Sequence, residues 1–199
     1  MGRRKAQSDR GFSVVELLMT MAVVAAAATI GVPMVGNMLA NFRISGDIRA
    51  LSNTTSVAKM RAAALFSPAR LYVDIAARTY RIQIWQKATT TWVDEGAVQR
   101  LSPNVGFGFG SVSAAPPNTQ GTINQADACR ADDGTVIAGT ACVVFNSRGL
   151  PVDSAGIPIG SGAFYLIDAT SVYGVTISAT GMVRAWRAQT TTTSTWSLI

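Results

Sequence analysis

The stretch GFSVVELLMTMAVVAAAATIGVPMVGNML, residues 11–39, decides the fold of this chain. A short basic leader ends at Gly11, and the next 28 residues carry a single charge, Glu16. A helix of that length measures about 42 Å, whereas the hydrocarbon core of a bilayer is about 30 Å thick. The sequence therefore predicts a helix over residues 12–39 that is long enough to span a membrane.

Glu16 is the unusual residue of this segment. A carboxylate in an apolar span costs about 3 kcal/mol unless a cation pairs with it, so such a residue is a functional candidate by default. We therefore expect Glu16 to have a positively charged partner.

The residues at the leader junction, GFSVVEL at 11–17, resemble the class III signal of type IV prepilins and type II secretion pseudopilins. The resemblance implies that a prepilin peptidase cleaves after Gly11 and that the new N-terminal residue, Phe12, is N-methylated. It also implies that Glu16 pairs with the N-terminal amine of a neighbouring subunit. Two buried charges of opposite sign neutralise each other when subunits pack, which agrees with this role.

Two other interpretations of the N-terminus stay open. Basic residues before an apolar run also describe a secretory signal peptide, and the alanines at 25–28 offer sites for its removal. The same segment also fits an uncleaved membrane anchor, whose basic flank would stay in the cytoplasm.

An amphipathic pattern continues the helix beyond residue 39 to about residue 66. Ser67-Pro68 ends it, since the residue before proline avoids helical geometry. Inside the helix, Pro33 removes one backbone hydrogen bond and predicts either a simple bend or, as the resemblance suggests, a stretch that melts during filament assembly. The apolar face should pack on a globular head and consists of Ile44, Ile48, Leu51, Ala58, Ala62 and Leu65.

After Pro68 the periodicity changes to two, which predicts an antiparallel β head. Small and polar residues at 111–140 predict a long loop. The expected fold is α+β and pilin-like, with a leader at 1–11, a transmembrane and filament-core helix at 12–39, its amphipathic continuation at 40–66 and a periplasmic head at 67–199. Strands are expected at residues 69–74, 79–86, 91–93, 105–109, 141–146, 163–167, 172–177 and 182–187.

Residue counts limit the chemistry that the chain can perform. The absence of histidine excludes Ser-His-Asp and Cys-His catalysis and imidazole-ligated zinc. Asp127, Asp132 and Asp133 are oxygen ligands close together in the chain, but their spacing favours an Asp-Asp-Gly turn over a calcium loop. We expect no enzyme activity, no metal and no cofactor.

Cys129 and Cys142 are the only cysteines. In an oxidising compartment they would form a disulfide that closes a loop of about fourteen residues and contributes roughly 3 kcal/mol. Two free buried thiols are the alternative.

The C-terminal sequences VVFNSRGLP at 143–151 and YGVTISATGMVRAWR at 173–187 are similar to the end of GspH/FimT-type minor pseudopilins. In these motifs Phe145 and Gly149 belong to a turn, and Gly181 supplies the positive φ of a tight strand connection. One branch of the family binds DNA through a G-R-x-R element. Here Met182 occupies the position of the first arginine of that element, and only the second arginine, Arg184, matches. DNA is therefore not an expected partner.

The charge of the chain gives little further support for nucleic-acid binding. The net charge is +6, but the leader holds four of the 17 basic residues and one of the 11 acidic ones, which leaves +3 for the mature chain. Arg184 and Arg187 are the candidate nucleic-acid contacts, yet a strand would place them on opposite faces.

The sequence as a whole predicts a minor subunit of a type II secretion pseudopilus or a type IV pilus. Its expected partners are other pilins or pseudopilins, the prepilin peptidase and inner-membrane lipid, with the head in the periplasm. A DNA-binding minor pilin and an uncleaved envelope protein are the alternatives.

Overall fold

The computed structural model describes residues 13–190 and 195–199, without the side chains of residues 30–35 and 37. It divides into two units, one up to Asn41 and one from Phe42 to Ile199. A single helix, α1 (Val14–Ala64), is assigned across the boundary between the units. The second unit is the globular head.

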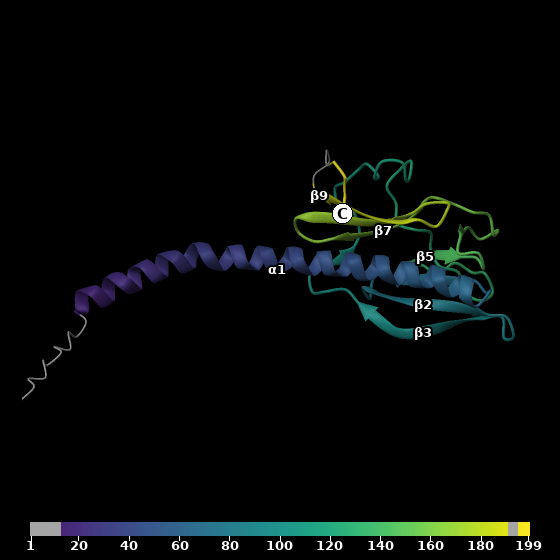
Figure 1. The fold of residues 1–199 in the computed structure, drawn as a ribbon, viewed down its shortest axis with the longest axis horizontal. Coiled ribbons are helices and arrows are strands. Elements are labelled where there is room, and N and C mark those ends of the chain that lie inside the picture. Colours follow the sequence, from purple (N-terminus) through teal and green to yellow (C-terminus); the bar gives the residue numbers. More distant parts are fainter. Residues whose placement is uncertain (1–12, 191–194) are drawn as a thin grey trace, which may run out of the picture. The chain divides into compact units, whose positions relative to one another are not determined.

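The head contains two antiparallel five-stranded sheets (Figure 1). The first has the order β3-β2-β1-β5-β6 and the second the order β10-β9-β8-β7-β4. The strands of the first sheet are β1 (Ala69–Asp74), β2 (Thr79–Gln86), β3 (Thr91–Arg100), β5 (Thr140–Phe145) and β6 (Pro151–Val152). Those of the second are β4 (Gly106–Phe107), β7 (Gly162–Ile167), β8 (Ser171–Ile177), β9 (Val183–Gln189) and β10 (Ser197–Leu198). The α+β class expected from the sequence is observed.

The head part of α1 shares one hydrophobic core with both sheets. Ile44, Ile48 and Leu51 have no exposed surface and pack in the same cluster as Leu71 of β1 and Phe164 of β7. Their spacing of three and four places them on one side of the helix, as the periodicity predicts. One side of α1 therefore contributes to a core that also contains residues of both sheets, and in the view of Figure 1 the helix appears between β2 and β7.

Polar contacts add to this packing at the start of the head. The carboxylate of Asp47 accepts hydrogen bonds from the backbone N–H of Ser102, at 2.9 Å, and from its hydroxyl, at 3.0 Å. The hydroxyls of Ser45 and Tyr173 are 3.2 Å apart. These bonds tie the helix to the loop after β3 and to β8.

Some sequence-based expectations need correction. Leu65 lies one residue beyond the end of α1 and is 49% exposed, because the chain turns at Phe66, which has a φ of 47°. The strand predicted at 91–93 extends to Arg100 as β3, with a register shift opposite Tyr80 and Ile82. The short strands β6 and β10 were not predicted.

Candidate functional site

The N-terminal half of α1 exposes an apolar surface. Its large hydrophobic side chains from Val14 to Val24 are each at least 51% exposed. Glu16 lies among them, is itself exposed and forms no ion pair with any residue that the structure describes. The apolar side chains are Val14, Val15, Leu17, Leu18, Met19, Met21, Val23 and Val24.

Several predicted features of this segment lie outside the described residues. Gly11 and Phe12 are not described, so cleavage and methylation stay predictions. The helix is assigned without interruption through residue 33, but the side chain of Pro33 lies outside the description. Within the described part of the chain, no helix combines the length and the apolar character needed to cross a membrane.

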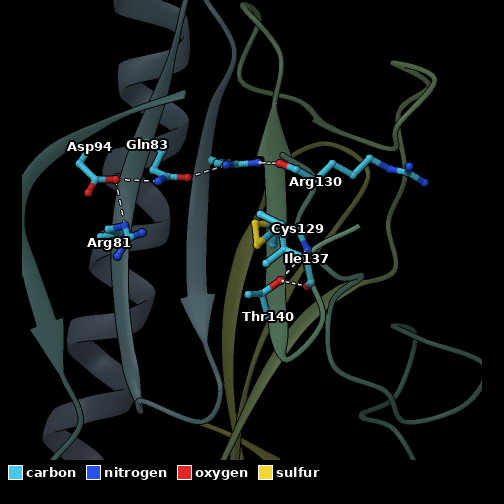
Figure 2. The surroundings of a disulfide bond; sticks show 9 residues. Arg81, Gln83, Asp94, Cys129, Arg130, Ile137 and Thr140 are labelled. Carbon is cyan, nitrogen blue, oxygen red and sulfur yellow. Dashed lines mark hydrogen bonds and ion pairs between the residues drawn. A yellow bond between two sulfur atoms is a disulfide. The ribbon is translucent and has the colours of Figure 1, made fainter. Parts of the chain in front are cut away.

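A disulfide joins Cys129, in the long loop before β5, to Cys142 of β5 (Figure 2). Hydrogen bonds fix the loop beside it. The backbone N–H of Cys129 donates to the hydroxyl of Thr140 at 2.9 Å, and that hydroxyl donates to the carbonyl of Ile137 at 2.6 Å. The N–H of Cys142 donates to the carbonyl of Asp127 at 2.8 Å. The loop is therefore held against the face of the first sheet that points away from α1.

A buried arginine lies on this outer face. Arg70 of β1 is only 3% exposed, and its Nε donates to Oε1 of Gln83 at 2.7 Å. The amide of Gln83 donates to Asp94 at 2.6 Å, and Asp94 forms an ion pair of 2.9 Å with Arg81, as Figure 2 shows. Arg70 Nη1 donates to the carbonyl of Arg130, so the network links the sheet to the disulfide loop.

Aromatic rings complete the surroundings of Arg70. Its Cζ lies 4.1 Å from the centroid of the Trp92 ring, and the rings of Trp85 and Trp92 meet edge to face at 5.3 Å. Burial lowers the pKa of Arg70 to about 10, so the guanidinium still carries its charge at neutral pH. The arrangement can bind an anion or a polar chain, but it presents no nucleophile paired with a base.

The two arginines predicted as nucleic-acid contacts do not converge. Arg184 and Arg187 are three residues apart on β9 and lie on opposite faces of the strand. Arg187 lies over the ring of Tyr173, with its Cζ 5.7 Å from the ring centroid. Arg184 lies opposite Thr176 and donates to the sulfur of Met182 at 3.3 Å.

The glycines of the C-terminal motifs lie in two turns that meet on α1. Gly149 and Gly181 have φ values of 74° and 75°. The ammonium of Lys59 donates to the carbonyl of Gly181 at 2.9 Å, and a Cβ on Gly149 would lie 3.1 Å from Cγ of Lys59. Phe145 of β5 is fully buried. These motif residues hold the two turns against the helix.

Two aspartates of the long loop accept hydrogen bonds, one from β3 and one within the loop itself. Oδ1 of Asp132 accepts from the backbone N–H of Trp92 at 2.9 Å. Asp133 accepts from the N–H and the hydroxyl of Thr135, which lowers its pKa. Among the described residues, no three His, Cys, Asp or Glu side chains are grouped to hold a metal ion.

Arg70 was missed in the sequence because alternation assigns it to a solvent-facing position of β1. The only signal was the pair of aromatic residues Trp85 and Trp92 on the same face of the neighbouring strands. Nothing in the local pattern indicates that the loop near Arg130 covers this face.

Comparisons with known proteins give one structural likeness. No family model and no curated protein matches the sequence. Among solved structures, the chain is similar to the minor pseudopilin EpsH from the Type 2 Secretion System of Vibrio cholerae, with a TM-score of 0.38 and 10% sequence identity. The alignment covers 79% of this chain and 96% of that chain.

Proposed function

We propose that this chain is a minor pilin or pseudopilin subunit, processed after Gly11 and assembled into a filament through the N-terminal half of α1. The observation that carries the proposal is the exposed apolar surface of that half, which contains one carboxylate, Glu16. Contiguous apolar surface of this kind marks an interaction site. Bundling of several copies covers it, and the α-amine of a processed neighbour supplies the cation for Glu16.

The head is proposed to lie in the periplasm, with residues 12–39 holding the subunit in the inner membrane before assembly. The Cys129–Cys142 disulfide supports this placement, because structural disulfides persist in oxidising compartments such as the bacterial periplasm. The partners are then the prepilin peptidase and other subunits of the filament. A DNA-binding role is not proposed, since Arg184 and Arg187 face opposite ways on β9.

Charge at Glu16 provides the test of assembly. Glu16→Gln keeps the shape of the side chain and removes its charge, whereas Glu16→Asp keeps the charge. We expect both variants to be processed, and we expect the glutamine variant to be reduced about tenfold in sheared filaments, with partial recovery for aspartate. Equal amounts of the wild type and the glutamine variant in the sheared fraction would refute the pairing of Glu16.

The N-terminal peptide of the purified protein tests processing independently. Mass spectrometry should find a methylated N-terminus at Phe12, and Gly11→Leu should accumulate only the precursor. A peptide that begins at Met1 would instead identify an uncleaved anchor. Deletion of the gene, scored for exoenzyme secretion, surface pili and DNA uptake, then identifies the machine that the subunit serves.

A further inference from the structure

A half-open groove of about 880 Å³ lies between the outer face of the first sheet and the disulfide loop. Arg70, Trp85 and Trp92 line it from the sheet, and Arg130 lines it from the loop. Val144 of β5 and Val152 of β6 add apolar surface. The groove thus combines a cation, two indole rings and aliphatic side chains, and it lies wholly within the head.

The guanidinium of Arg70 can donate a further hydrogen bond. Its Nε and Nη1 donate to Gln83 and to the carbonyl of Arg130, but Nη2 has no hydrogen-bond partner among the described residues. No carboxylate in the described part of the chain forms an ion pair with it. Asp132 and Asp94 attract the guanidinium electrostatically without forming an ion pair with it, so an anion that reaches Nη2 adds a charge-assisted hydrogen bond.

The guanidinium is also held in place before any ligand arrives. Arg70 is on β1, which pairs with β2 on one side and β5 on the other, and Trp92 lies against its guanidinium at 4.1 Å. Two of its nitrogens are fixed by hydrogen bonds. Binding therefore costs little side-chain entropy, which favours recognition by a single charged contact.

The charges around the groove restrict the ligand. Asp127, Asp132 and Asp153 also line it, against Arg70 and Arg130, so its overall charge repels polyanions such as nucleic acids. A ligand with a single negative charge is repelled less than a polyanion, and Arg70 can offset that one charge by direct contact. The volume is far larger than a free carboxylate such as acetate fills and is near the upper end of the range for ligand pockets, about 300–1,000 Å³.

From these observations we propose that the groove binds a polypeptide segment through one carboxylate side chain, which accepts a hydrogen bond from Nη2 of Arg70 while its neighbours pack against Trp85 and Trp92. This site is separate from the apolar surface of α1, and the proposal does not depend on filament assembly.

The four tryptophans of the chain allow a direct test. Indole N–H signals of the full-length protein in detergent micelles would be followed by NMR during titration with acetyl-AAEAA-amide, and with acetyl-AAQAA-amide as the uncharged match. We expect the signals of Trp85 and Trp92 to shift and saturate with the glutamate peptide, with a Kd of about 1 mM. Trp186 and Trp196 lie in the second half of the head, outside the groove lining, and should not move.

Variants separate recognition from folding. Arg70→Lys should abolish the saturable shift while the Trp186 and Trp196 signals keep their positions, and Arg100→Lys, at the far end of β3, should bind as the wild type does. Absence of a shift at about 10 mM peptide would overturn the proposal. Equal shifts with both peptides would exclude the carboxylate, and an equal saturating shift with sodium acetate would exclude the polypeptide.

Discussion

The carbonyl oxygen of Gly149 lies 2.6 Å from the point that a Cβ atom on Gly181 would occupy. The turn between β5 and β6 therefore touches the turn between β8 and β9, and each turn belongs to a different sheet. Lys59 of α1 contacts both glycines. The two sheets and the helix meet at this point.

Gly181→Ala should destabilise the head by about 3 kcal/mol, because the methyl group meets the carbonyl of Gly149 and the backbone has a φ of 75°. Gly156→Ala is the matched control, since Gly156 has a φ of 79° and nothing within 4 Å of its Cβ position. We expect Gly156→Ala to lower the free energy of unfolding by only about 1 kcal/mol. Urea unfolding measures both, and equal losses would show that contact between the turns is unimportant.

Gly46→Ala should stabilise the protein by about 1 kcal/mol, because Gly46 lies inside α1 and alanine is the better helix former. A Cβ there has nothing within 4 Å. Gly96 in β3 also has nothing within 4 Å of its Cβ position, but its φ is 80°. Gly96→Ala should therefore destabilise the protein. Thermal unfolding of the two variants compares them, and a stability loss at Gly46 would contradict the helical assignment.

Loss of the Cys129–Cys142 bridge should cost about 3 kcal/mol, the value for a loop of this length in the chain-entropy model. A reductant should therefore lower the urea midpoint of the wild type. The double variant Cys129→Ser, Cys142→Ser should start from the lower midpoint and show no response to reductant. A wild type insensitive to complete reduction, verified by thiol titration, would contradict the expectation.

Alkaline pH should destabilise the head partly through Tyr80. Burial, followed by the nearby charge of Asp47, raises the pKa of Tyr80 from 10.0 to about 12. Between these values the unfolded chain releases the proton while the folded chain retains it, so the free energy of unfolding falls as the pH rises. Tyr80→Phe should remove this component, which urea unfolding from pH 8 to 12 would detect. If the free energies of unfolding of the variant and the wild type changed in parallel with pH, this contribution of Tyr80 would be excluded.

Local patterns predict the central strands of the first sheet well. The boundaries expected for β1 and β2 coincide with those observed, because apolar residues such as Leu71 and Ile82 alternate with outward polar ones. The continuation of β3 past Val93 was missed, since it is an exposed edge strand of mostly polar residues with a left-handed glycine at position 96. The alternation of apolar and polar residues predicts which side of a strand is buried, but it does not predict which sheet the strand joins.

The two candidate sites, at Glu16 and at Arg70, also differ in how well the sequence predicts them. Glu16 is visible in sequence because a lone charge interrupts an apolar run. Arg70 is visible only in three dimensions, because its burial depends on a loop that begins more than thirty residues later and is tied down through Cys129. Spacing along the chain carries no information on such a long-range contact.

The pairing of β1 with β5 also joins two strands that the ribosome synthesises at different times. From Asp74, the end of β1, to Thr140, the start of β5, the chain advances 66 positions. At about 5–20 residues per second, translation of that interval takes roughly 3–13 s. Until β5 has been synthesised, β1 can pair with β2 but not with β5, so one of its two edges has no partner strand in the growing chain.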